Sequence, residues 1–286
     1  MPPLPPPLAM TSEERYLFDL NGYLVRPRAL SPDEVAALCA LLDRHRSRLR
    51  DRADSLAGGA PRLRGGHRRA ELEALSVGCG PENRPFWRLL VHPAVTPVLT
   101  SLLGRGFRLD HSPLFLVMRR DTEGMLLHGG GGPEFDPSTF YLFRNDQMHC
   151  GLVAVEWFLS AVRPGDGGLC VVPGSHKSNY RCPESLRRLE AMTGAVHAVT
   201  GEAGDLVVFS EGLTHGTLPW TGDEERLVLL LRYAPANAAY ARDYAPAWHG
   251  LETALLDPDV RSLFEPPYHL RLERPTLDGR RDDTWK

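Results

Sequence analysis

Two segments near the start of the chain carry the signals of helix starts. A capping box begins at Thr11 and another begins at Ser31, each with a glutamate three residues later. In this motif the cap hydroxyl and the glutamate satisfy backbone N–H groups that a helix start leaves free. The second box opens a segment in which apolar side chains recur at helical spacing: Val35, Leu38, Leu41 and Leu42. The pattern predicts a helix after each box, with a short strand at Tyr23–Val25 between them.

Two further stretches have helical character. Residues 85–103 carry apolar side chains at helical spacing, and Pro93 and Pro97 are expected to divide them into two pieces, because proline cannot continue a helix hydrogen-bond ladder. A short helix is expected near residues 252–264. Residues 51–70 mix Gly, Ala and Arg without periodicity, so a loop is expected there.

From about residue 113 the pattern changes to short β-rich runs separated by Gly and Pro. Such runs, without alternating helices, favour a sandwich or barrel over a parallel sheet. The predicted fold class is therefore mainly β with flanking helices. The whole chain, residues 1–286, is expected to form a single domain, preceded by a loose Pro-rich arm over residues 1–10. The β-rich runs cover residues 113–120, 151–162, 167–175, 204–210 and 225–235.

The composition of the chain argues against several classes of protein. The chain has 286 residues, of which 42% are hydrophobic and 24% charged, as in an ordinary globular protein. The formal net charge of −3 offers no general attraction for a nucleic-acid polymer. No apolar run is long enough for a membrane span. Five cysteines without a CxxC pair suit a reducing cytoplasm. We therefore expect a cytoplasmic protein that binds neither a nucleic-acid polymer nor a membrane; the sequence does not reveal its oligomeric state.

Three residues have settings that suggest chemistry. His128 follows the apolar run Met125–Leu127, and His215 follows a strand-like run that ends at Phe209. A histidine at a strand end can project from a rigid scaffold into a cavity, although a hydrogen-bonded structural role is the simpler alternative for each one alone. Arg226 enters a buried run and needs an anionic partner, either a ligand carboxylate or a neighbouring glutamate such as Glu225.

These residues lie within three longer motifs: FDLNGYLVRPRALSPDEVAAL, VEWFLSAVRPGDGGLCVVPGSHKS and GDLVVFSEGLTHGTLPWTGDEERLVLLLRY. In this order the motifs resemble the phytanoyl-CoA dioxygenase family of Fe(II)/2-oxoglutarate-dependent oxygenases. The resemblance extends from about Phe18 to Pro235. The PGSH stretch together with the His-x10-Arg spacing is its most specific part.

The resemblance implies a double-stranded β-helix, the jelly roll of cupin type. It also implies that two histidines and one carboxylate bind Fe(II) and leave positions open for O2 and 2-oxoglutarate. His215 would be the second histidine ligand and His128 the first. Arg226 would bind the far carboxylate of 2-oxoglutarate with help from Thr217. His176, in the PGSH stretch, is expected to be structural.

The sequence departs from the family pattern at the first histidine. The family has His-x-Asp or His-x-Glu there, whereas this chain has His128-Gly129-Gly130. The arrangement resembles that of the non-heme iron halogenases, some of which act on nucleotides. It implies that chloride fills the iron position beside Gly130, so that His128, His215 and Gly130 form the catalytic centre. The hypothesis predicts chlorination of an unactivated C–H bond of a natural-product precursor, with a nucleoside or nucleotide such as a deoxyadenosine phosphate as a suggested substrate.

Two alternatives remain open. Glu134 or Asp136, in the same loop, could supply the missing carboxylate, and the enzyme would then be a hydroxylase. Alternatively, the chain has lost its iron chemistry and is a ligand-binding relative.

Overall fold

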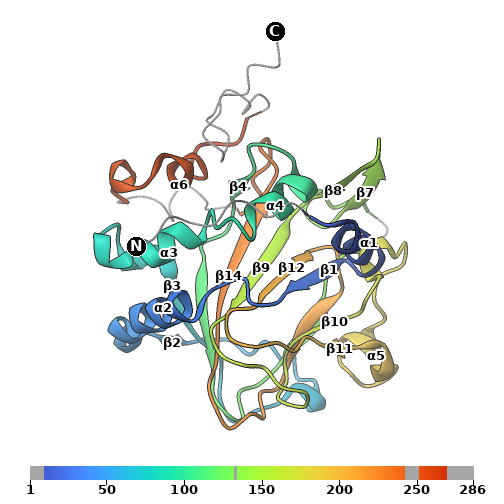
Figure 1. Cartoon of the computed structure of the whole chain (residues 1–286). Coiled ribbons are helices and arrows are strands. Elements are labelled where there is room, and N and C mark those ends of the chain that lie inside the picture. Colours follow the sequence, from blue (N-terminus) through green and yellow to red (C-terminus); the bar gives the residue numbers. More distant parts are fainter. Residues whose placement is uncertain (1–9, 132–133, 242–250, 269–286) are drawn as a thin grey trace.

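Two antiparallel sheets form the centre of the molecule, with their inner faces packed together (Figure 1). The structure is a computed structural model that describes residues 10–131, 134–241 and 251–268. Within these ranges the larger sheet has the order β1-β12-β9-β14-β5-β3-β2, with β4 paired to β14, and the smaller has the order β11-β10-β13-β6. The arrangement is the expected jelly roll.

Each of the five β-rich runs of the sequence contains one strand, whereas the other strands, apart from the expected one that begins at Tyr23, lie outside these runs. Those of the larger sheet are β1 (Tyr23–Arg26), β2 (Arg50–Asp51), β3 (Ala70–Glu73), β4 (Arg108–Leu109), β5 (Leu114–Met118), β9 (Val153–Phe158), β12 (Leu206–Ser210) and β14 (Arg226–Ala234). Those of the smaller sheet are β6 (Met125–His128), β10 (Gly168–Val171), β11 (His197–Ala198) and β13 (His215–Leu218).

Each face of the larger sheet is buried against a different layer. On β9, Val155 and Trp157 point into the core beneath the helices, whereas Ala154 and Phe158 point into the core between the sheets. The alternation explains why β9 is buried at every position, and it confirms that Trp157 is a core residue. By the same alternation Arg226 and Arg232 of β14 lie on the inner face, together with Val228. Charged side chains therefore enter the space between the sheets at both ends of β14.

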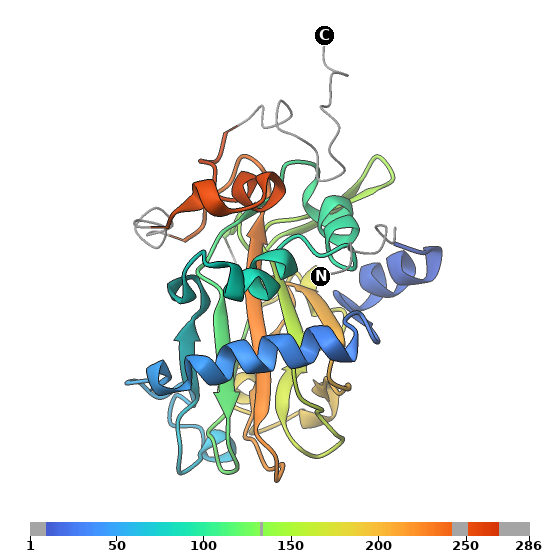
Figure 2. The ribbon, with the colours of Figure 1, turned by 60° about the vertical axis from the view of Figure 1, so that its left-hand side comes forward.

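Helices cover the outer face of the larger sheet, and α2 crosses in front of its strands (Figure 2). Both capping boxes form as predicted. The segment 85–103 divides into two helices, and a short helix forms near the C-terminal end, both as predicted. The helices are α1 (Ser12–Asn21), α2 (Pro32–Arg44), α3 (Arg84–Leu89), α4 (Thr96–Leu103), α5 (Glu184–Arg187) and α6 (Pro258–Ser262).

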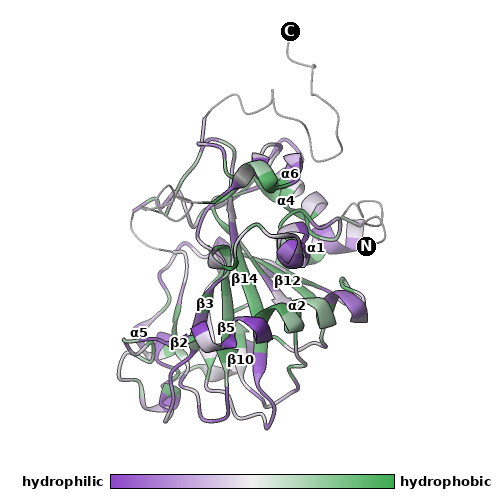
Figure 3. Ribbon diagram, turned by 90° about the vertical axis from the view of Figure 1, so that its left-hand side faces the viewer, coloured by the Kyte–Doolittle hydropathy of each residue, from purple (hydrophilic) through white to green (hydrophobic). Residues whose placement is uncertain are grey.

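Hydropathy follows this layering, with apolar strands inside and polar residues toward the loops (Figure 3). No described helix combines the length and the apolar character that a bilayer crossing requires. The predicted Pro-rich arm lies outside the described residues over 1–9, and Met10 is already buried. One hairpin, β7 (Tyr141–Arg144) with β8 (Gln147–Cys150), was not anticipated by the sequence pattern.

Candidate metal centre

His128 and His215 face each other on neighbouring strands of the smaller sheet. They are paired directly in the register of β6 and β13, and their ring centroids are 4.1 Å apart. His215 is almost fully buried, whereas His128 is half-buried. The structure therefore brings together the two histidines that the sequence singled out, although they are 87 positions apart in the chain.

Hydrogen bonds fix which nitrogen of each ring is available. Nδ1 of His215 lies 2.7 Å from the carbonyl oxygen of Leu213, and Nδ1 of His128 lies 3.1 Å from that of Leu126. Because a carbonyl only accepts, each Nδ1 carries the proton and donates it. Nε2 of each neutral ring then keeps its lone pair, as a metal ligand must. Burial and the neighbouring His128 ring lower the pKa of His215 to about 4, which keeps this ring neutral at ordinary pH.

The third member of the site is Glu211, a residue that the sequence analysis did not select. It lies in the turn that joins β12 to β13, four residues before His215. Its carboxylate and the two imidazoles offer ligand atoms that all lie within 4.8 Å of one another, and they form the one such cluster in the described ranges. Oε2 of Glu211 is 3.6 Å from Nε2 of His215.

Arg232 holds the Glu211 carboxylate from the larger sheet. Its Nε donates to Oε1 of Glu211 over 2.5 Å. Burial opposes ionisation of Glu211, but the Arg232 guanidinium and the two imidazoles outweigh it and hold the pKa at about 2. The site thus contains a buried anion whose Oε1 is bound by Arg232 and whose Oε2 faces the histidines.

The glycines after His128 make room for the turn that carries Glu211. A Cβ at Gly130 would lie 2.8 Å from the carbonyl oxygen of Gly212, and a Cβ at Gly129 would lie 2.3 Å from that of Leu213. The Gly130 N–H also donates to the Gly212 oxygen over 3.0 Å. Backbone therefore fills the space that the first carbon of a side chain at position 130 would need. The premise that the site lacks a carboxylate was wrong, because Glu211 provides one from another turn.

Glu134 and Asp136, the carboxylates that sequence reasoning offered as alternatives, do not join the cluster. Asp136 instead accepts hydrogen bonds from the backbone N–H and the hydroxyl of Ser138, over 2.8 and 2.7 Å. His149, a further histidine that could serve as a metal ligand, is exposed on β8 and is not part of the cluster. His176 packs edge-on against Tyr141 and contacts the Asp19 carbonyl oxygen over 3.1 Å, which supports its structural role.

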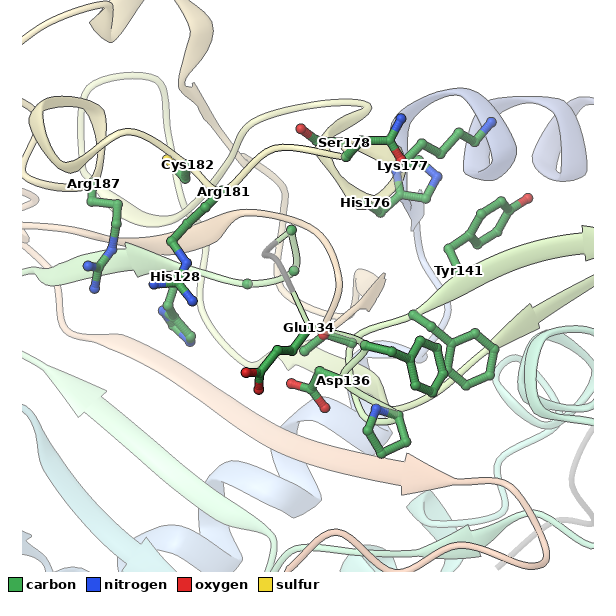
Figure 4. Close-up of a pocket in the computed structure, with 18 residues that line it drawn as sticks. His128, Glu134, Asp136, Tyr141, His176, Lys177, Ser178, Arg181, Cys182 and Arg187 are labelled. Carbon is green, nitrogen blue, oxygen red and sulfur yellow. The ribbon is translucent and has the colours of Figure 1, made fainter.

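A cleft of about 980 Å³ opens beside His128 (Figure 4). Arg181, Arg187, Glu134 and Asp136 line the cleft together with His128. Nε of Arg187 donates to the carbonyl oxygen of Leu127, the residue before His128, over 3.0 Å. The aromatic rings of Phe135 and Phe140 also line the cleft. A ligand in this cleft meets charges of both signs next to the metal cluster.

Arg226 lies between the sheets and is only 2% exposed. One of its terminal nitrogens donates to Oε2 of Glu156 over 2.7 Å, while its Nε is buried without a hydrogen-bond partner. Its ion pair is with Glu156, rather than with either glutamate next to it in the sequence. Thr217, two residues after His215 on β13, is also buried.

The donor set fits Fe(II). Two imidazole nitrogens and one carboxylate, leaving other positions open, are the ligands of the non-heme iron oxygenases. Fold and donor set together define the class: this enzyme is a jelly-roll oxygenase that depends on Fe(II) and 2-oxoglutarate. The chain belongs to the phytanoyl-CoA dioxygenase (PhyH) family, whose model matches residues 18–228.

Individual relatives agree with this assignment. An ectoine dioxygenase of Stutzerimonas stutzeri (strain A1501) is 26% identical over 237 residues, covering 74% of this chain and 72% of the relative. HygX from Streptomyces hygroscopicus, solved with nickel and 2-oxoglutarate bound, is 25% identical with a TM-score of 0.65, covering 82% of this chain and 91% of HygX. SnoK, a non-heme alpha-ketoglutarate-dependent carbocyclase from nogalamycin biosynthesis, shares the fold at 21% identity, with a TM-score of 0.58 and coverage of 82% and 88%.

Glu211 did leave a signal in the sequence. The run SEGLTH places a carboxylate four residues before a histidine, directly after the buried strand Leu206–Ser210. A charged residue at the end of such a buried strand needs a polar or charged partner. A turn of four residues can bring the side chain of Glu211 back to that of His215. The family pattern places the carboxylate two residues after the first histidine, whereas Glu211 precedes the second histidine.

Proposed function

We propose that this chain hydroxylates a small molecule and that His128, Glu211 and His215 hold its Fe(II). One observation carries the proposal: two imidazoles, each with Nδ1 hydrogen-bonded to a backbone carbonyl group, meet a buried carboxylate beside an open cleft. The carboxylate replaces the one that the His128-Gly129-Gly130 sequence lacks. Hydroxylation is therefore favoured over chlorination, and neither chloride nor Gly130 has a catalytic role in the proposal.

The residues around the cluster have separate tasks. Bound Fe(II) allows O2 and 2-oxoglutarate to oxidise a C–H bond of the substrate. Arg232 keeps Glu211 ionised and oriented toward the histidines. Arg226, assisted by Thr217, anchors the far carboxylate of 2-oxoglutarate between the sheets, where apolar side chains exclude water. Leu213 and Leu126 orient the imidazoles through their carbonyl groups.

The cleft indicates the kind of substrate. Its volume of about 980 Å³ suits a small molecule, and arginines and carboxylates near His128 suit a compound that carries both positive and negative groups. The names of two relatives also point to small molecules: one is an ectoine dioxygenase, and HygX has been solved with hygromycin B bound. The nucleotide hypothesis loses support at Arg69, which could bind a phosphate group but is instead paired with Glu71 over 2.6 Å. We also propose that the protein is cytoplasmic.

Metal binding tests the proposal most directly. We expect Glu211→Gln to weaken Mn(II) binding, measured anaerobically by calorimetry, by about tenfold or more, because the metal loses its only anionic protein ligand. The same variant should lose succinate formation from 2-oxoglutarate with Fe(II). Glu134→Gln, which changes a cleft carboxylate outside the cluster, is the matched control and should keep wild-type metal affinity. Loss of binding in the Glu134 variant with full binding in the Glu211 variant would refute the ligand assignment.

A further inference from the structure

A buried ion pair occupies the place where the proposed cosubstrate anchor lies. Glu156 on β9 and Arg226 on β14 are 5% and 2% exposed, and the Arg226 guanidinium donates to Oε2 of Glu156 over 2.7 Å. Both residues lie on the inner faces of their strands, with Phe158 and Met118 beside the guanidinium. Arg226 is therefore already bound to a carboxylate of the protein itself.

Such a pair changes what the arginine can offer to a ligand. A guanidinium with no carboxylate partner gains a full charge-assisted pair when a ligand carboxylate arrives. Here the arriving carboxylate meets a glutamate that holds one edge of the same group. Two carboxylates on one buried guanidinium leave a net negative charge in a site shielded from water, which is unfavourable.

The surroundings restrict how the conflict can be relieved. Gly168 is packed against the arginine side chain, and a Cβ at that position would lie 2.8 Å from Nε and 3.1 Å from Cδ. Met118 lies 3.8 Å from a terminal nitrogen, Nη1. Because neighbours pack closely around Arg226, a ligand carboxylate has to compete with Glu156 for the guanidinium.

We propose that Glu156 is a specificity-determining residue that competes with the far carboxylate of 2-oxoglutarate for Arg226. The inference rests on the proposed function, because it requires the oxoacid to bind at Arg226. It implies that the protein binds 2-oxoglutarate more weakly than an unpaired Arg226 would allow. It also implies that the affinity for an oxoacid without the far carboxylate is little affected by Glu156.

A pair of oxoacids separates this effect from general damage to the site. 2-Oxoglutarate and 2-oxovalerate have the same carbon chain, but only the first carries the second carboxylate. We measure binding to the Mn(II)-loaded Glu156→Gln protein by calorimetry under anaerobic conditions. 2-Oxoglutarate should bind about tenfold or more tightly than it does to the wild type, because no protein carboxylate then competes for Arg226. 2-Oxovalerate should bind as it does to the wild type, within about twofold.

Glu14→Gln is the matched control. Glu14 also pairs with a largely buried arginine, Arg26, over 2.6 Å, but Glu14 lies in the first turn of α1 rather than between the sheets. This variant should leave the affinity for both oxoacids unchanged. An equal change for both acids in Glu156→Gln, or no change for either, would overturn the inference.

The wild-type protein provides a second test that does not depend on the variant folding. If Glu156 competes for Arg226, the wild type should prefer 2-oxoglutarate to 2-oxovalerate by less than about a hundredfold, the preference expected for an unopposed charged hydrogen-bonded pair. A preference well above that value contradicts the inference. If Mn(II)-loaded wild type binds neither acid, the proposed function fails instead, so the two failures can be told apart.

Discussion

Arg232 determines how Glu211 is held, because its guanidinium lies on the side of the carboxylate away from the histidines. Arg232→Met should leave a buried carboxylate without its cation and lower the free energy of unfolding of the metal-free protein by about 2–3 kcal/mol. Adding Mn(II) should restore part of that loss, because the metal supplies the missing positive charge. Urea unfolding with and without Mn(II) measures both effects.

Arg46→Met is the control for this change. Arg46 forms ion pairs with Asp43 and Glu225 at the surface, so its removal should cost less than about 1 kcal/mol, with or without metal. Equal losses in the two arginine variants would mean that Arg232 does not support the site.

His176 provides a pH-dependent test at the same scale. Burial and the nearby Lys177 lower the pKa of His176 to about 4, against 6.5 for an ordinary histidine. Between these values the unfolded chain binds more protons than the folded one, so the contribution of His176 to stability is constant above pH 6.5 and falls as the pH drops toward 4. His176→Gln should therefore lose less stability than the wild type between pH 7.5 and pH 5, as measured by urea unfolding.

His149→Gln, at an exposed position on β8, should show the same acid loss as the wild type. If His176→Gln also shows the full loss, protonation of another group causes the acid sensitivity.

Two loops that are distant in the sequence support each other where they come together next to the metal centre. The turn 211–214 and the glycines after His128 pack backbone against backbone, and Gly130 donates to the Gly212 carbonyl oxygen. Gly130→Ala would place a methyl group 2.8 Å from that oxygen, so the turn must shift and take Glu211 with it. We expect a several-fold weaker affinity for Mn(II), measured by calorimetry.

Gly194→Ala is the matched control, because a Cβ there meets nothing within 4 Å. It should leave metal affinity unchanged. Wild-type affinity in Gly130→Ala would show that the turn does not need the glycine.

The contact between these two loops explains why the sequence predicts only part of the metal centre. Short, predominantly apolar runs identified β9, β12 and β14, and capping boxes located α1 and α2. Their places near strand ends made His128 and His215 candidates, and the family resemblance assigned them as the two histidine ligands. Glu211 could not be assigned in the same way, because its role depends on the turn 211–214 reaching the loop after His128. The ion pair of Glu156 with Arg226 could not be predicted either, because it depends on the register of β9 and β14.

Across the whole molecule, the metal centre lies where the two sheets meet. His128 and His215 belong to the smaller sheet, whereas Glu211 follows β12 of the larger sheet and is held by Arg232 of β14. An ion bound to all three ligands would therefore link the two layers of the jelly roll. Because it binds the folded state alone, it should also stabilise that state by mass action, by about 2.7 kcal/mol at a hundred times its dissociation constant.

Hydrogen exchange can locate this effect within the fold. With Mn(II) bound, backbone amides of β6, β13 and the turn 211–214 should exchange more slowly than in the metal-free protein, because opening either sheet at the cluster then requires release of the ion. Strand β3, in the larger sheet beyond β5, should change less. Glu211→Gln should lose protection in the turn while keeping some along β6 and β13, because two histidine ligands remain on the smaller sheet. Protection confined to the smaller sheet in the wild type would show that the ion does not link the layers and that Glu211 is not its ligand.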